Sequence, residues 1–233
     1  MEFYMKLLAI GAHPDDIEIF MLGLLLACKN RGDEIHTIIA TDGSKGNVLT
    51  SKDLKNKRLR ETKKALQGIS NPIMLNFKDG NLSYQKEVEK TLMNNINNLN
   101  PDLIVTHAPE DYHPDHKALS NYVTNSVGFK FPTIYCDTLM CIDFKPDYYV
   151  DITPFFERKK EAIMCHKTQY PEKFVKATEL MNRFRASQCN QTEGNYAETF
   201  RKCDRFPFID LRYLLPEPPK IKPFYTGESS SFI

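Results

Sequence analysis

The sequence has no surplus of charge of either sign and no long uninterrupted apolar run. Its 31 Lys and Arg residues balance 30 Asp and Glu residues, which leaves a formal net charge of +1. Without a strong basic field, the chain is not expected to bind nucleic acid. The longest apolar stretch, residues 17–28, is interrupted by Glu18 and is shorter than the roughly 20 residues that span a bilayer. We therefore expect no transmembrane helix.

Paired cysteine motifs are also missing. The six cysteines are scattered, and no two of them form a Cys-x-x-Cys pair. In a chain of this length the pattern is typical of reduced, buried thiols, although a disulfide framework or a thiolate zinc site stays open. No basic segment followed by a long apolar core is found at the N-terminus, so no secretory signal is predicted. These features predict a cytoplasmic location.

What the sequence does contain is an alternation of strand-like and helix-like segments. Strands are predicted at residues 6–11, 35–41, 72–76 and 102–106, and helices at about 17–30, 52–67 and 85–99. Parallel strands need long crossovers, and helices supply them. The first 130 residues or so therefore predict a Rossmann-like α/β layer, a mostly parallel sheet with helices on both faces.

The rest of the chain predicts a completion of this layer. Two further strands (133–136, 148–152) and two helices (from Thr153, and 172–188) form a C-terminal α/β extension over about residues 131–205. A proline-rich tail, about 206–233, is expected to be extended and packed on the body or on a partner. We expect a single domain over residues 1–233.

Two clusters of ionisable residues follow predicted strands. Ala12-His13-Pro14-Asp15-Asp16 comes directly after the first strand, and Asp111-Tyr112-His113-Pro114-Asp115-His116 comes a few residues after the fourth. Ligands of such sheets bind beyond the carboxyl ends of the strands, so the two loops are expected to meet. Closely spaced carboxylates repel one another, which makes such a cluster costly unless it binds something.

Imidazole and carboxylate groups in this mixture predict a metal site. Catalytic Zn²⁺ takes three protein ligands and keeps a fourth position for water, and His13, Asp16 and His116 supply such a set. Fe²⁺ accepts the same ligands, so both metals stay open. The ionisable residues left over are candidates for general base, proton donor or oxyanion stabiliser, and orienting partner: Asp15, His113 and Asp115.

These clusters, with Thr41-Asp42-Gly43 and Cys165-His166-Lys167-Thr168-Gln169, resemble the PIG-L or LmbE-like family of zinc-dependent N-acetylglucosaminyl de-N-acetylases over about residues 6–200. The resemblance implies a hydrolase that removes an N-acetyl group from an N-acetylglucosamine-type sugar or its conjugate, as a homo-oligomer. It implies that a metal-bound water attacks the amide. The implied roles are zinc ligands for His13, Asp16 and His116, general base for Asp15, oxyanion stabiliser for His113 and its partner for Asp115.

The loop after the second predicted strand departs from the family pattern. Residues 43–46 read Gly-Ser-Lys-Gly, whereas many members have Gly-Glu there. Because this loop helps to bind the sugar in relatives, the sequence fixes neither the sugar nor its aglycone. The candidate substrate-binding residues are Asp42, Lys45, Arg58, Arg60 and Tyr112.

Two other functions stay open. The same fold could be a non-catalytic sugar- or nucleotide-binding module, although no Gly-x-Gly-x-x-Gly motif follows the first strand. A metallo-phosphoesterase would need a second metal about 3.5–4 Å away and more carboxylate ligands. Counting the metal ions bound per chain separates these alternatives from the deacetylase.

Overall fold

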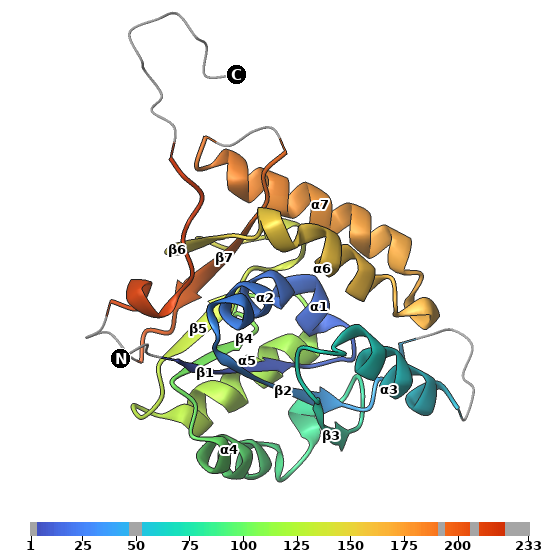
Figure 1. The fold of residues 1–233 in the computed structure, drawn as a ribbon. Helices are drawn as coiled ribbons and strands as arrows, with labels where there is room; N and C mark the ends of the chain where they lie inside the picture. Colours follow the sequence, from blue (N-terminus) through green and yellow to red (C-terminus); the bar gives the residue numbers. More distant parts are fainter. Residues whose placement is uncertain (1–3, 47–52, 191–193, 206–209, 222–233) are drawn as a thin grey trace, which may run out of the picture.

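The computed structural model describes residues 4–46, 53–190, 194–205 and 210–221. Within them, a seven-stranded sheet has the order β3-β2-β1-β4-β5-β7-β6 (Figure 1). The strands are β1 (Lys6–Gly11), β2 (Glu34–Thr41), β3 (Ile73–Phe77), β4 (Leu103–Thr106), β5 (Thr133–Cys136), β6 (Tyr148–Asp151) and β7 (Ala197–Lys202). The first five pair in parallel, and β7 pairs antiparallel to both β5 and β6.

Two helical layers cover the sheet. The helices are α1 (Asp16–Phe20), α2 (Leu22–Arg31), α3 (Leu54–Ala65), α4 (Val88–Leu99), α5 (Pro114–Val127), α6 (Phe156–Ile163) and α7 (Pro171–Ser187). Helices α1, α2, α6 and α7 lie on one face, and α4 and α5 lie on the other (Figure 1). None of the described helices is long and apolar enough to cross a membrane.

The central strand β1 shows why the sheet needs both layers. Successive side chains of a strand point to opposite faces. Leu7 and Ala9 pack in the core beneath α1 and α2, whereas Leu8 and Ile10 pack in the core beneath α4 and α5. All four are fully buried. An apolar run without polar alternation therefore marks a strand that is covered on both faces, as the sequence predicts.

The chain changes direction across the sheet at β1. Strand β2 pairs with one edge of β1, and β4 pairs with the other, with Ile10 opposite Thr106 near their carboxyl ends. A doubly wound sheet opens a crevice at such a switch point. The segments that leave β1 and β4 therefore start side by side.

The predicted α/β class is confirmed, with three local corrections. The helix expected over 17–30 is two helices, because Met21 adopts non-helical backbone angles between α1 and α2. Helix α5 was not predicted, although its buried Leu119, Val123 and Val127 have helical spacing. Strand β7 was not predicted either, because charged residues interrupt its apolar pattern.

Strand β7 ties the C-terminal extension to the first helical layer. The Glu198 carboxylate accepts hydrogen bonds from Gly23 N (2.8 Å) and Leu24 N (2.7 Å), two of the amides that a helix N-terminus leaves unpaired. Lys159 on α6 donates to the same carboxylate at 2.6 Å and to Asn182 on α7 at 3.2 Å. Helix α2 is thus capped by a residue about 175 positions away in the sequence.

The proline-rich tail is described only over residues 210–221. Leu211, Leu214 and Leu215 are buried in the core of the first layer. Asp151 N at the end of β6 donates to Glu217 O at 2.9 Å. This part packs on the body, as expected, and the predicted tail at 206–209 and 222–233 lies outside the described residues.

Candidate functional site

The turn between β1 and α1 carries the first predicted cluster. His13 N donates to Asp16 Oδ2 at 2.6 Å, which closes the turn and places both side chains on its inner side. Asp15, between them, has a φ of 132°. Residues other than glycine seldom adopt such angles, which cost on the order of 1–3 kcal/mol and are concentrated at functional sites.

The N-terminus of α5 carries the second cluster. His113 caps the helix, because its Nδ1 accepts a hydrogen bond from Asp115 N at 3.2 Å, and Pro114 occupies the first helical position. His116 follows in the first turn. The motif that we expected in a loop is therefore held by a helix, which fixes the spacing of its imidazoles.

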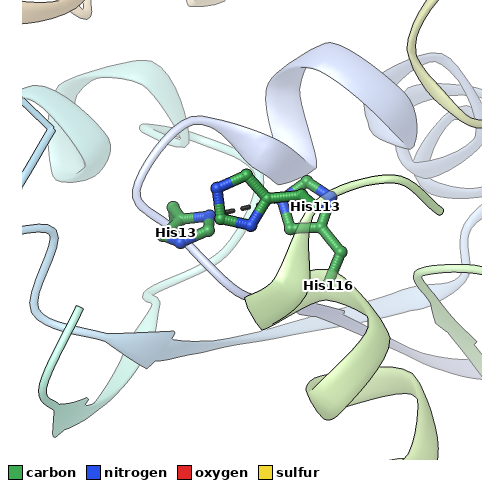
Figure 2. A group of neighbouring side chains, drawn as sticks. All are labelled: His13, His113 and His116. Atoms are coloured by element: carbon green, nitrogen blue, oxygen red, sulfur yellow. Dashed lines mark hydrogen bonds between the residues drawn. The ribbon is translucent and has the colours of Figure 1, made fainter. Parts of the chain in front are cut away.

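The three predicted metal ligands converge at the switch point. His13 Nδ1 lies 3.2 Å from His116 Nε2 (Figure 2). Asp16 Oδ2 lies 3.3 Å from each of these nitrogens. A tetrahedral ion with ligand bonds of 2.0–2.1 Å places neighbouring donor atoms about 3.3–3.4 Å apart. All three residues are buried. The triangle therefore has the dimensions of one face of a tetrahedral metal site.

Carboxylates orient both histidines. His116 Nδ1 lies 3.0 Å from Asp111 Oδ2. His13 Nε2 lies 3.3 Å from both Asp79 Oδ1 and Asp115 Oδ2. Because carboxylates only accept, we assign the ring protons to these outer nitrogens, which turns a lone pair of each ring toward the centre of the triangle. In the neutral rings these lone pairs and Asp16 Oδ2 face one another, and three acceptor atoms repel unless a proton or a metal ion lies between them.

The electrostatics of the triangle favour a positive charge. Burial lowers the pKa of His116, but the carboxylates of Asp16 and Asp111 outweigh it and raise this pKa to about 9. Burial likewise opposes the charge on His13, yet Asp16 and its other acidic neighbours raise its pKa well above the ordinary value. Burial raises the pKa of Asp16, but His116, His107 and His13 together hold it well below its usual range.

Besides the imidazoles of His13, His113 and His116, the site contains that of His107, which directly follows β4 and packs against the triangle. Its ring stacks on His116 with centroids 3.8 Å apart, and its Nε2 lies 3.0 Å from Asp16 Oδ2. Burial and the charge on His116 lower the pKa of His107 to about 4, so its ring is neutral. His107 is fully buried.

Arg58 holds the predicted base, Asp15. Its Nη2 lies 3.1 Å from Asp15 Oδ1 and also donates to Pro14 O, while its Nη1 donates to Gly43 O at 3.1 Å. Arg58 is 2% exposed, so α3 places a charged group in the interior next to a strained turn. Burial raises the pKa of the Asp15 carboxyl above its ordinary value, and the Arg58 guanidinium opposes this shift.

The contacts of Asp115 differ from those expected. Its carboxylate accepts from Gly80 N at 2.7 Å and Leu82 N at 3.0 Å and lies against His13, not against His113. These contacts outweigh burial and lower its pKa to about 2. Burial, together with His13 and His116, lowers the pKa of His113, so its neutral form is favoured. Since His113 Nδ1 accepts from a backbone amide, Nε2 carries the proton of the neutral ring.

A cavity of about 300 Å³ opens over the triangle. Of the five candidate substrate-binding residues, Lys45, Arg58 and Tyr112 line it. Asp42 instead accepts from Ser44 N at 3.1 Å within its own loop, and Arg60 is an exposed residue whose nearest acid is Asp53. The C-terminal extension adds a partly apolar wall to the cavity, made of Leu139, Gln169 and Phe174.

Sequence reasoning missed two acidic residues of the site. Asp111 belongs to the second cluster, but its contact with His116 depends on where α5 begins. Asp79 follows β3 in the short sequence Lys78-Asp79-Gly80 and reaches His13. The carboxyl end of β3 lies at the same sheet edge as the other loops, so the rule that located the two clusters also applied to Asp79.

Comparison with known proteins gives a match to a family model and a similar protein sequence. The family model described as PIG-L, GlcNAc-PI de-N-acetylase, matches residues 8–127. The chain is 28% identical over 219 residues to the diacetylchitobiose deacetylase of Thermococcus kodakarensis, which covers 84% of this chain and 82% of that protein.

Solved structures share the fold. The N,N'-diacetylchitobiose deacetylase of Pyrococcus horikoshii superposes with a TM-score of 0.75 at 28% identity, over 89% of this chain and 88% of that one. The 4-carboxy-2-hydroxymuconate hydratase GalB of Pseudomonas putida KT2440 gives a TM-score of 0.76 at 19% identity, over 88% and 98%. At that identity the second likeness shows the fold alone.

Proposed function

Because the chain belongs to the PIG-L family, whose model covers just over half of it, we propose that it is a metal-dependent hydrolase that removes an N-acetyl group from an N-acetylglucosamine-type sugar or its conjugate. The observation that carries the metal dependence is the triangle of His13, Asp16 and His116, with sides of 3.2 and 3.3 Å. The similarity to two diacetylchitobiose deacetylases supports the sugar class. The cytoplasmic location, the single-domain organisation and the homo-oligomeric state stay predictions.

The donor set suits Zn²⁺ and also Fe²⁺, since two imidazoles and one carboxylate serve either ion. An ion bound there would polarise the acetyl carbonyl and make a water molecule more acidic. Asp111, Asp79 and Asp115 hold the two histidines in the tautomers that such an ion requires.

Asp15 is the proposed general base. It lies at the cavity next to Asp16, and its raised pKa brings it closer to neutral pH, where a base both takes and returns a proton efficiently. It would take a proton from the attacking water and deliver it to the departing sugar amine. Arg58 fixes the orientation of its carboxylate through the 3.1 Å contact.

His113 is the proposed oxyanion stabiliser. It lines the cavity, its Nδ1 is occupied by Asp115 N, and its Nε2–H is the remaining donor. A neutral imidazole that donates a hydrogen bond can stabilise the charge that develops on the acetyl oxygen. Loss of one such donor typically lowers the rate about 10²–10³-fold.

Acetate release tests the proposal. We expect release from N-acetylglucosamine, diacetylchitobiose or an N-acetylglucosaminide conjugate, with about one metal ion per chain and complete loss of activity after treatment with a chelator. Two ions per chain with phosphate release would instead indicate a phosphoesterase. Acetate release that a chelator leaves unchanged would contradict the metal dependence, and binding of sugar without any metal would indicate a binding module.

A further inference from the structure

Asp79 is a buried acidic residue with two different neighbours. It follows β3, is 5% exposed and lines the cavity. Its Oδ1 lies 3.3 Å from His13 Nε2, and its Oδ2 accepts a hydrogen bond from Lys45 N at 2.9 Å. One carboxylate therefore joins a proposed metal ligand to the loop that follows β2.

The second acid at His13 is less free to move. Asp115 Oδ2 also lies 3.3 Å from His13 Nε2, but this oxygen is 2.7 Å from Gly80 N, and Asp115 Oδ1 accepts from Leu82 N. His13 Nε2 thus faces two acids at the same distance: it is hydrogen-bonded to Asp115, which two backbone amides also hold, and it lies in ion-pair contact with Asp79 Oδ1.

The described residues around Asp79 anchor its backbone, but none of them except His13 faces its Oδ1. Asp79 N donates to Asp42 Oδ1 at 3.4 Å, which anchors its backbone. Arg58 Nη1 lies 3.9 Å away from Oδ2, the oxygen that already accepts from Lys45 N. Oδ1 remains directed at His13, because among the described residues no other donor is placed against it.

We propose that Asp79 is a positioning residue for metal binding, which holds His13 with its Nδ1 lone pair toward the ion and couples that orientation to the loop at Lys45. This inference rests on the metal site of the proposed function. Carboxylates that accept from the outer nitrogen of a metal-binding histidine typically contribute 10–100-fold to metal affinity. Because Asp115 still accepts from His13 when Asp79 is changed, the expected effect lies at the lower end of that range.

The test compares metal affinity in three variants. Asp79→Asn keeps one acceptor oxygen, so it can hold His13 or Lys45 N but not both, and Asp79→Ala holds neither. The matched control is Asp102→Asn, because Asp102 also accepts from a backbone amide, Lys6 N at 2.8 Å, but lies at the opposite end of β1. The dissociation constant of Zn²⁺ is measured by competition with a chromophoric chelator, and the Co²⁺-loaded proteins are compared by absorption spectroscopy.

Asp79→Asn is expected to weaken Zn²⁺ binding about tenfold. Asp79→Ala weakens it at least as much, both variants shift the Co²⁺ spectrum, and Asp102→Asn changes neither. Dissociation constants within about twofold of the parent protein in the Asp79 variants would overturn the proposal. If Asp79→Ala does not fold, as judged by circular dichroism, the nearly isosteric Asp79→Asn decides. Neither measurement uses a substrate, so failure of the deacetylase proposal would appear separately, as absent acetate release from a protein that binds metal.

Discussion

Replacing Lys159 with methionine tests whether the buried contact between α6 and β7 maintains the fold around the site. Lys159 is fully buried and its Nζ lies 2.6 Å from Glu198 Oε1. Removing one partner of a buried ion pair typically costs about 3–5 kcal/mol, because the other charge is left uncompensated. Glu198 keeps its bonds to two helix amides, so we expect a loss of about 3 kcal/mol in the free energy of unfolding.

A double-mutant cycle separates this charge effect from lost packing. Glu198→Gln removes the charge and keeps one carbonyl acceptor, which can serve only one of the two α2 amides. The double variant Lys159→Met/Glu198→Gln should therefore cost less than the sum of the single variants, by about 1–3 kcal/mol. The control is Lys160→Met on the same helix, whose partner Glu157 is largely exposed, and it should change stability by no more than about 0.5 kcal/mol.

Urea unfolding followed by far-ultraviolet circular dichroism measures these energies, since the chain has no tryptophan. A cost below about 1 kcal/mol for Lys159→Met, or strict additivity in the double variant, would refute the reasoning.

Two further predictions concern individual residues. Asp15→Asn should retain the metal while kcat falls about 10²–10⁴-fold, whereas His116→Ala should lose the metal itself; metal analysis beside kinetics decides, and a normal kcat for Asp15→Asn would remove the proposed base. Burial lowers the pKa of His166, but Glu18, 2.9 Å away, raises it above 6.5 overall, so the pair stabilises the fold below that pH and less as the pH rises through the raised pKa. His166→Gln should therefore destabilise the protein more at about pH 6 than at about pH 9 in urea unfolding, and an equal loss at both would contradict this linkage.

The extent to which the site could be predicted follows from where its residues lie in the sequence. His13, Asp16 and His116 were found because they occur in two short polar segments, each after an apolar strand. Asp79 stands alone after β3, and only the sheet order brings it to His13. Arg58 was a candidate for substrate binding, but its contact with Asp15 could not be predicted from the sequence.

The fold shows the same difference between features that a local sequence pattern predicts and features that depend on contacts between distant residues. Strands with continuous apolar runs, such as β1 and β2, are visible in the sequence because both of their faces are buried. Strand β7 is not, because Glu198 places a charge in the interior whose compensation comes from Lys159, far away in the chain. Local patterns report burial against an apolar core, and they do not report polar contacts between distant segments.

The position of β7 has a consequence for the order in which the chain assembles. β6 precedes β7 in the sequence, but it joins the sheet only by pairing with β7. In a nascent chain the position beside β5, which β7 later occupies, therefore stays empty. Until residues 197–202 arrive, two strand edges stay unpaired, which invites aggregation. A version truncated after residue 190 should therefore precipitate on refolding, as light scattering would show, whereas recovery of a clear, folded product would contradict this order.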